Sequence, residues 1–294
     1  MRIRRIAILI DAGFFLKRLP KLVAHQHRDT PEKVARIVNL LCRTHVLHIT
    51  EAEKKRWHDH VYRIFFYDAV PYSGQAHHPL KNQQIDFGKT AEAQFRLALF
   101  DCLRRQRKLA LRLGKVTREG DWSPPTDKVR RLLATRDWVA SLNLNGLENG
   151  GQVTLTKQQA EEAVRLQKRW GEIDNNGITL GLRQKGVDMR IGLDIASITL
   201  KKQADTIILV SGDSDFVPAA KLARREGVEF ILDPLWQSVN EDLFEHIDGL
   251  HSGLSKPGAQ SNAGIAAAIA DADQAAAELV PASAPRAAEA ELEE

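Results

Sequence analysis

Hydrophobic and polar positions follow two rhythms along most of this chain. Short apolar runs of strand length occur at residues 3–10, 61–67, 206–211 and 228–232, with a more basic strand at 108–116. Helical patterns, with apolar residues three or four positions apart, occur at residues 31–48, 90–105, 188–203, 215–226 and 238–247. Because strands alternate with helices, the pattern predicts an α/β fold with a doubly wound, mainly parallel sheet.

Local signals mark two helix ends within this pattern. Thr30 has the side chain of an N-cap, and Pro31 occupies the first helical position, where its missing N–H costs nothing. Gly227 follows the helix predicted at 215–226 and is typical of the C′ position that ends a helix.

Residues 117–184 interrupt the strand–helix rhythm. Gly120 and the pair Pro124–Pro125 punctuate this segment, which leaves two short possible helices at 126–140 and 156–170. We therefore expect a domain over residues 1–251 that contains an insertion at about 117–184.

The last 43 residues differ from the rest in composition and charge. Residues 252–294 contain 15 alanines and few large apolar side chains, which predicts a disordered tail rich in alanine and glutamate. Seven acidic and two basic residues give this tail a charge of −5, so the total of +4 leaves +9 on residues 1–251. A basic body is compatible with a polyanionic partner but does not identify one.

The class of protein follows from its cysteines and its apolar runs. Two cysteines, Cys42 and Cys102, cannot form a disulfide framework and are expected to be reduced. Asp11 interrupts the first apolar stretch after five residues, which is too short for a signal peptide or a membrane span. We expect a soluble cytoplasmic protein without a membrane partner, and the sequence leaves its oligomeric state open.

Five aspartates lie where predicted strands end or where the next helices begin. They are Asp11, Asp188, Asp194, Asp213 and Asp215. Groups beyond the carboxyl ends of parallel strands converge on one crevice, where several carboxylates repel each other unless a hard cation neutralises them. The pattern therefore predicts a site for Mg²⁺ or Mn²⁺, built mainly from Asp11, Asp194 and Asp213. For single residues a structural role stays open: Asp215 and Asp188 as helix caps, and Asp194 as a solvated helix position.

Three motifs resemble the NYN domain family, in its LabA-like or DUF88 branch, which is related to the PIN-like ribonucleases. They are Ile10-Asp11-Ala12-Gly13-Phe14, Lys185-Gly186-Val187-Asp188 followed by Asp194, and Leu209-Val210-Ser211-Gly212-Asp213-Ser214-Asp215-Phe216-Val217-Pro218. Arg225-Glu226-Gly227-Val228 fits as well, and the resemblance covers residues 3–72 and 178–248. The long motif around Asp213 is specific, whereas the first motif alone is weak. The segment 73–184 exceeds the compact core of the family.

The resemblance implies a PIN-like fold and a metal-dependent ribonuclease that hydrolyses phosphodiester bonds in single-stranded or structured RNA. It places Asp11, Asp194 and Asp213 in the catalytic metal set, with Asp188 and Asp215 as further ligands of Mg²⁺ or Mn²⁺. A module that binds RNA or regulates without cleaving it is the alternative.

Basic residues that could hold an RNA backbone cluster just before and within the strand predicted at 108–116. The candidates for RNA contact are Arg104, Arg105, Arg107, Lys108 and Lys185, and Trp122 and Trp138 are candidates for stacking on bases. A solvated basic face with buried tryptophans explains the same pattern.

Other chemistries fit the sequence less well. The pairs His58/His60 and His77/His78, and the group Cys42, His45 and His48, lack the paired spacing of a zinc site. Gly13 stands where a phosphatase of the haloacid dehalogenase type requires a second aspartate. No P-loop or dinucleotide fingerprint is present, so nucleotide cofactors are not indicated.

Overall fold

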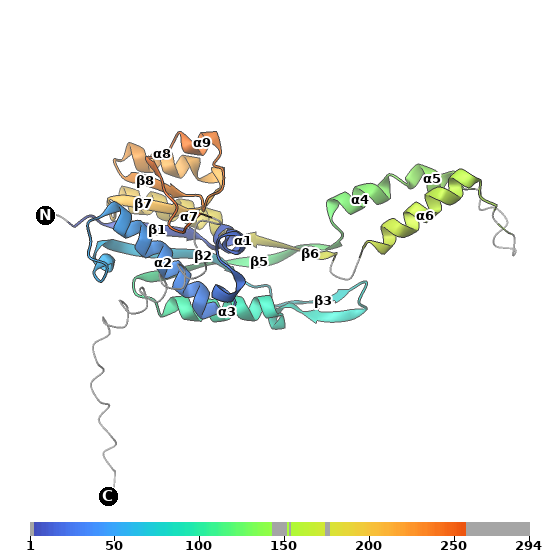
Figure 1. Cartoon of the computed structure of the whole chain (residues 1–294), viewed down its shortest axis with the longest axis horizontal. Coiled ribbons are helices and arrows are strands. Elements are labelled where there is room, and N and C mark those ends of the chain that lie inside the picture. The colour runs from blue at the N-terminus through green and yellow to red at the C-terminus, as the bar shows by residue number, and fades with distance from the viewer. Residues whose placement is uncertain (1–2, 143–151, 153, 174–176, 257–294) are drawn as a thin grey trace, which may run out of the picture. The chain divides into compact units, whose positions relative to one another are not determined.

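A computed structural model of the chain describes residues 3–142, 152, 154–173 and 177–256. These residues divide into two compact units (Figure 1). Unit 1 comprises Met1–Pro71, Ala91–Lys115 and Gln184–Glu294, and unit 2 comprises Tyr72–Thr90 and Val116–Arg183.

The central element is a seven-stranded sheet with the order β6-β5-β2-β1-β7-β8-β9. Its strands are β1 (Ile6–Asp11), β2 (Val61–Val70), β5 (Leu109–Ser123), β6 (Thr179–Lys185), β7 (Thr206–Val210), β8 (Glu229–Asp233) and β9 (Gly249–Leu250). The five pairings from β5 to β9 are all parallel. The prediction of a mainly parallel sheet is therefore confirmed. Strands β5 and β6 contribute residues to both units.

Helices cover both faces of this sheet. The helices of unit 1 are α1 (Ala12–Leu22), α2 (Pro31–Ile49), α3 (Ala91–Arg104), α7 (Val187–Leu200), α8 (Val217–Arg225) and α9 (Glu241–Phe244). Ile8 and Ile10 of β1 pack in one hydrophobic cluster with side chains of α1, α2 and α3, whereas α7 packs against β1 and β2 outside that cluster. Residues 6–10 are buried on both faces, which explains why the run is uninterrupted by polar residues. The doubly wound arrangement is confirmed.

Several element boundaries differ from the sequence prediction. Helix α1 was not expected, although it buries Ala12, Phe15, Leu19 and Leu22 at helical spacing. The helix predicted at 215–226 is divided into a 3₁₀ turn, η5 (Ser214–Phe216), and α8. The helix predicted at 238–247 is reduced to α9.

The two helix ends predicted from local signals are confirmed. The hydroxyl oxygen of Thr30 accepts a hydrogen bond from Lys33 N at 3.3 Å, and Pro31 begins α2. Gly227 follows α8 with a φ of 76°, a left-handed conformation that suits glycine.

Unit 2 combines a hairpin with short helices. Its elements are β3 (Gln75–His78), β4 (Gln83–Asp86), η3 (Phe87–Lys89), α4 (Thr126–Leu133), α5 (Arg136–Ala140) and α6 (Lys157–Gly171). The helix predicted at 126–140 is thus interrupted between α4 and α5. Trp122 packs against His78 and Phe87, with ring centroids 4.6 and 6.1 Å away. These contacts favour a packing role for Trp122 over base stacking.

Three sequence predictions concern the remaining parts of the chain. Residues 252–256 of the predicted tail are described, and Leu254 is buried in the core, while the prediction for residues 257–294 falls outside the described residues. Cys42 and Cys102 are both free thiols, as expected. None of the described helices is long and apolar enough to cross a bilayer.

Candidate active site

The sheet has a topological switch point between β1 and β7. From β1 the chain continues to β2 on one side, and from β7 it continues to β8 on the other. Loops diverge at such a point beyond the carboxyl ends of the strands, which is where open α/β sheets bind ligands. A cleft of about 600 Å³ lies here. It is lined by Asp11, Gly13, Phe14, Lys17, Gln184, Asp188, Ser211, Gly212, Asp213, Ser214, Gln237, Ser238 and Asn240.

Asp11 ends β1 and caps α1 at the same time. Its Oδ1 accepts a hydrogen bond from Phe14 N at 3.2 Å, and its Oδ2 accepts one from the Ser211 hydroxyl at 3.3 Å. Burial raises the pKa of Asp11, and the charge of Asp188 raises it further, while the bond from Phe14 N opposes both effects. Asp11 is therefore held rigidly in a place where its negative charge is disfavoured.

Asp188 joins the cleft from the first turn of α7. Gly186 caps this helix with a φ of 77°, so the chain turns sharply from β6 into α7. Burial raises the pKa of Asp188, and the charges of Asp213 and Asp215 contribute in the same direction. Asp188 thus couples electrostatically to Asp11 on one side and to the loop after β7 on the other.

Asp213 lies in the loop that follows β7. Its Oδ1 accepts a hydrogen bond from Asp215 N at 3.0 Å, so Asp213 caps η5. The capping role that the sequence suggested for Asp215 therefore belongs to Asp213. The Ser211 hydroxyl accepts a bond from Asp213 N at 3.3 Å and donates one to Asp11, which ties the Asp11 carboxylate and the backbone of Asp213 to one buried side chain.

Gly212 is required by close packing rather than by a left-handed turn. A Cβ at this position would lie 2.8 Å from Cε2 of Phe14, closer than Cβ contacts normally occur. The missing side chain therefore makes room for the Phe14 ring, which lines the same cleft.

Asp194 and Asp215, the other two predicted ligands, do not line this cleft. Asp194 accepts a hydrogen bond from the Tyr67 hydroxyl at 2.9 Å and forms an ion pair with Arg112 Nε at 3.1 Å. Six residues of helix separate it from Asp188, which turns the two side chains to different faces of α7. Asp215 is exposed and influences the cleft through its charge on Asp188.

The basic run at residues 104–108, which the sequence predicted to bind RNA, lies at the end of the sheet opposite to the acidic cleft. Lys108 immediately precedes β5, so residues 104–108 lie at the amino ends of the parallel strands. The Lys108 ammonium donates to the carbonyls of His58 and Val61 at 2.8 and 2.6 Å, and burial lowers its pKa. Arg104 forms an ion pair with Asp101. Lys185, in contrast, ends β6 directly before α7 and the acidic cleft.

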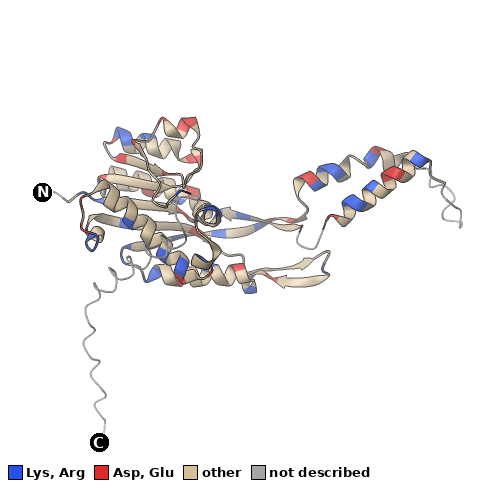
Figure 2. Cartoon of the chain, viewed as in Figure 1, with Lys and Arg blue, Asp and Glu red and all other residues tan. Residues whose placement is uncertain are grey.

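The helices of unit 2 carry both signs of charge. Figure 2 shows acidic and basic positions interspersed along α4 and α6. Lys128 pairs with Glu172 at 2.6 Å, and Arg165 pairs with Glu162 at 2.6 Å. Pairing of this kind reduces the field that these helices present to a polyanion.

Sequence reasoning missed most of the polar side chains that complete the cleft. These are Lys17, Gln184, Gln237, Ser238 and Asn240. Lys17 lies on α1, and the apolar spacing of that helix was a usable signal. Gln237, Ser238 and Asn240 lie in the loop after β8. This strand pairs with β7, which the loop of Asp213 follows. A search beyond the carboxyl end of each predicted strand identifies them.

The chemistry of the cleft suits a hard divalent cation. Its charged acceptors are carboxylates, and the pKa values of Asp11 and Asp188 are raised, mainly by burial and further by the neighbouring aspartates. Among the described residues, however, no group of three or more Asp, Glu, His or Cys side chains is already arranged to hold a metal ion. The same finding gives no support to zinc at Cys42, His45 and His48.

Comparison with known proteins identifies the domain. Residues 137–251 match the NYN domain, which belongs to the PIN-like superfamily. The chain is thus similar to an NYN domain over less than half of its length. The match to the NYN domain includes Asp188, Asp194, Asp213 and Asp215, while Asp11 precedes it. An NYN domain indicates a nuclease-like function.

Two further comparisons add little to this NYN assignment. No curated protein matches the chain. The crystal structure of a protein of unknown function from Vibrio parahaemolyticus RIMD 2210633 is similar at 14% identity and a TM-score of 0.35. The alignment covers 85% of this chain and 94% of that one. A similarity at this level bears on neither fold nor function.

Proposed function

We propose that this NYN protein is a ribonuclease that depends on Mg²⁺ or Mn²⁺. The observation that carries the proposal is the convergence of Asp11, Asp188 and Asp213 on one cleft at the switch point of the sheet. Their mutual repulsion favours a divalent cation, which when bound supplies positive charge for the phosphodiester and for an attacking water. RNA is the proposed partner, and a cytoplasmic location stays a prediction.

The side chains of the cleft divide into three roles in this proposal. Asp11, Asp188 and Asp213 hold the cation, and Asp215 adds negative charge beside Asp188. Lys17 is the one lysine or arginine among the described residues that line this cleft, so we assign it to a phosphate oxygen.

We assign Asp194 a role different from the one implied by the family resemblance. It is engaged by Tyr67 and Arg112, so we propose that it orders Arg112 at the sheet rather than binding the cation. The RNA backbone is proposed to follow Lys17 and Lys185 at the carboxyl edge, because Arg104, Arg105, Arg107 and Lys108 lie at the other edge of the sheet.

A second candidate is an RNA-binding module that does not cleave. It is favoured by the finding that the carboxylates of the described chain are not pre-assembled into a three-ligand group. The two candidates share the cleft and differ in turnover alone.

The test is cleavage of single-stranded and structured RNA by purified protein with Mn²⁺ or Mg²⁺. Asp213→Asn keeps an oxygen that can cap η5 but removes the charge, so we expect cleavage to fall on the order of 100-fold or more while folding is retained. Asp101→Asn is the matched control, because Asp101 is exposed on α3 outside the cleft. Equal cleavage by wild type and Asp213→Asn would reject the assigned site. RNA binding without any cleavage would support the second candidate.

A further inference from the structure

The four residues 251–254, which we call the C-terminal strap, connect the last strand to helix α2. His251 N donates to Leu232 O at 3.1 Å, which continues the pairing of β9 with β8. Gly253 packs so tightly on α2 that a Cβ there would lie 2.7 Å from the ring of His45 and 2.8 Å from Leu41. Leu254 is buried in the core cluster. The strap is therefore part of the folded body, although the composition of this segment predicted disorder.

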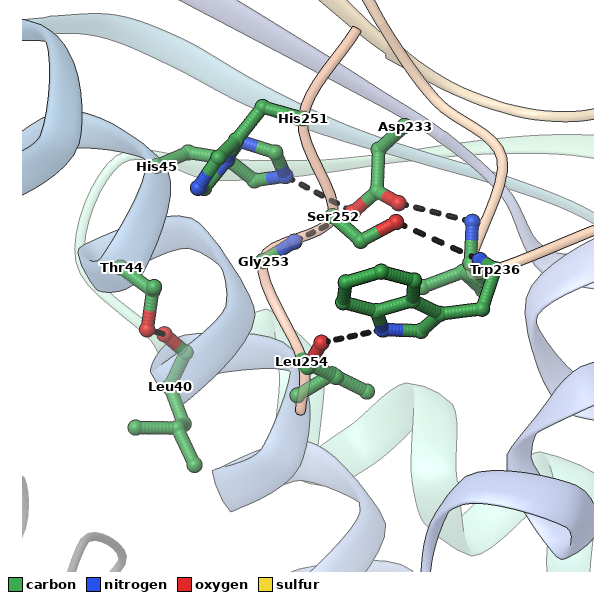
Figure 3. Close-up of polar contacts among 10 residues, drawn as sticks. Leu40, Thr44, His45, Asp233, Trp236, His251, Ser252, Gly253 and Leu254 are labelled. Atoms are coloured by element: carbon green, nitrogen blue, oxygen red, sulfur yellow. Dashed lines mark hydrogen bonds and ion pairs between the residues drawn. The ribbon is translucent and has the colours of Figure 1, made fainter. Parts of the chain in front are cut away.

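A buried chain of polar groups holds the strap (Figure 3). His45 and Asp233 are fully buried, and His45 Nε2 lies 2.8 Å from Asp233 Oδ2. The same carboxylate oxygen accepts a bond from Gly253 N at 3.0 Å. His251 Nδ1 faces His45 Nδ1 at 3.2 Å, and the His251 ring stacks on His48 with centroids 3.8 Å apart.

The strap also holds the loop that follows β8. Ser252 Oγ accepts a bond from Trp236 N at 3.3 Å, and Leu254 O accepts one from the Trp236 indole at 2.7 Å (Figure 3). Leu235 and Trp236 adopt left-handed φ values of 47° and 62°, which are costly for residues with a Cβ and require support from their surroundings. Directly after them come Gln237 and Ser238, which line the acidic cleft.

We propose that the His45–Asp233–His251 network is a positioning device for the cleft, which clamps the strap onto Trp236 and so fixes the loop 234–240. The clamp closes only while the two facing Nδ1 atoms share a single proton, so acid releases it. This role rests on the proposed function insofar as the cleft is an active site. The clamp itself does not depend on catalysis.

The proton positions follow from the partners. A carboxylate only accepts, so the Nε2 of His45 that faces Asp233 carries a proton. A hydrogen bond between the two facing Nδ1 atoms needs one donor and one acceptor, so a single proton lies between them. A further proton on His45 would bring two N–H groups face to face at 3.2 Å, and a charge on His251 would lie beside the rings of His45 and His48.

The pH range follows from the groups that face His251. Helix α2 contributes His45 and His48, and strand β8 contributes Asp233. Cys42, also on α2, lies near Asp233. Burial lowers the pKa of His251 to about 4, and charge on His45 and His48 acts in the same direction. A released His251 titrates near its ordinary value of about 6.5, so closure is complete above that pH and is lost as pH falls toward 4. Within that window each pH unit weakens closure by about tenfold.

The first experiment follows the indole N–H of Trp236 in the full-length, ¹⁵N-labelled protein. The chain has five tryptophans, and Trp236→Phe identifies the resonance that belongs to Trp236. On titration from pH 7.5 to pH 4.5 we expect this signal to move from a hydrogen-bonded to a free position. In His251→Asn, whose amide still donates but does not titrate, we expect the signal to stay in place. A Trp236 signal that moves equally in wild type and in His251→Asn would overturn the protonation step.

The second experiment measures hydrogen exchange of the peptide that contains Leu235, Trp236 and Gln237 at pH 7.5. Gly253→Ala inserts a methyl group against His45, so we expect about tenfold or greater loss of protection in this loop. Gly192→Ala on α7 is the matched control, because a Cβ there meets nothing within 4 Å, and we expect no loss. If Gly253→Ala fails to fold, Trp236→Phe provides the comparison, since it removes the indole N–H that bonds Leu254 O together with part of the ring.

The outcomes separate this inference from the proposed function. Unchanged protection of the loop in Gly253→Ala or Trp236→Phe would overturn the positioning role, whether or not the protein cleaves RNA. Loss of protection in a protein that proves unable to cleave RNA would keep the clamp and reject only the nuclease.

Discussion

In the sheet of unit 1, acidic residues gather at the carboxyl ends of the strands (the carboxyl edge) and basic residues at their amino ends (the amino edge). The two groups differ in how far their charge is compensated by neighbouring groups. At the carboxyl edge Asp11, Asp188 and Asp213 gather around one cleft, and burial and mutual repulsion raise the pKa values of the first two. At the amino edge two members of the basic run 104–108 are satisfied locally, Arg104 by Asp101 and Lys108 by two backbone carbonyls.

The difference shows that the density of charge in a sequence does not indicate where a ligand binds. The basic run is the more conspicuous feature of the sequence. Its member Lys108, however, bonds two backbone carbonyls and so stabilises the fold. The acids are scattered over about 200 residues, and they converge because parallel strands end at the same edge. Uncompensated charge, rather than abundant charge, marks the candidate site.

Lys108→Met is the strongest test of the structural role assigned to the amino edge. It removes two charge-assisted hydrogen bonds and leaves the carbonyls of His58 and Val61 without that donor, so we expect a loss of about 2–3 kcal/mol in the free energy of unfolding. Urea denaturation measures it. Arg107→Met is the matched control, expected within about 0.5 kcal/mol of wild type because Arg107 is exposed. A basic edge built for RNA predicts instead that both variants fold normally and lose affinity alike.

Gly212→Ala tests the packing beneath the acidic cleft. The added Cβ lies 2.8 Å from the Phe14 ring, so the ring or the loop has to move, and we expect a destabilisation of about 1–2 kcal/mol. Thermal unfolding measures the effect. Gly171→Ala serves as the control, because a Cβ at Gly171 has no neighbour within 4 Å. A neutral Gly212→Ala would show that the glycine is not needed for this close approach.

Asp11→Asn tests whether the uncompensated negative charge of Asp11 destabilises the folded protein. Asparagine retains the cap on Phe14 N but carries no charge, so without divalent cations we expect a gain on the order of 1 kcal/mol at pH 7. The raised pKa of Asp11 means that its penalty is absent below the pKa of the unfolded state, about 3.9, and develops as pH rises through the folded value. The gain should therefore disappear at acidic pH, as followed by urea denaturation at several pH values. A destabilising Asp11→Asn at pH 7 would contradict the repulsion.

Tyr67→Phe is expected to have the smallest effect. It removes one hydrogen bond to Asp194, whose ion pair with Arg112 remains, so we expect a loss of about 0.5–1 kcal/mol. If Asp194 lies outside the cation site, the rise in melting temperature caused by Mn²⁺ should be the same in Tyr67→Phe and wild type. A diminished response to Mn²⁺ in this variant would return Asp194 to the site.

The sequence was sufficient for the fold and pointed to Asp11, Asp188 and Asp213, whose role as a metal site stays a prediction, and it was insufficient for the surroundings of these acids. Strand runs buried on both faces, the Thr30 cap and the Gly227 C′ position are local signals, so they predicted the architecture correctly. Asp188 and Asp194 could not be separated in this way, because their roles depend on which face of α7 meets Tyr67 and Arg112. Lys108 appeared to be a solvent-exposed cation because its carbonyl partners lie 47 and 50 residues away. The strap was missed because its composition is that of the tail, while its partner His45 is about 200 residues distant.

The response of the melting temperature to Mn²⁺ in Asp188→Asn and Asp194→Asn tests the site most directly. Each variant is compared with itself without the cation, so unrelated changes in stability cancel. Wild type and Asp194→Asn should gain equally, by about 2.7 kcal/mol at a hundredfold excess over Kd, because a ligand that binds only the folded state stabilises it by mass action. Asp188→Asn should gain much less. A full response in Asp188→Asn together with none in Asp194→Asn would contradict the assignment of the cation to the cleft of Asp11, Asp188 and Asp213.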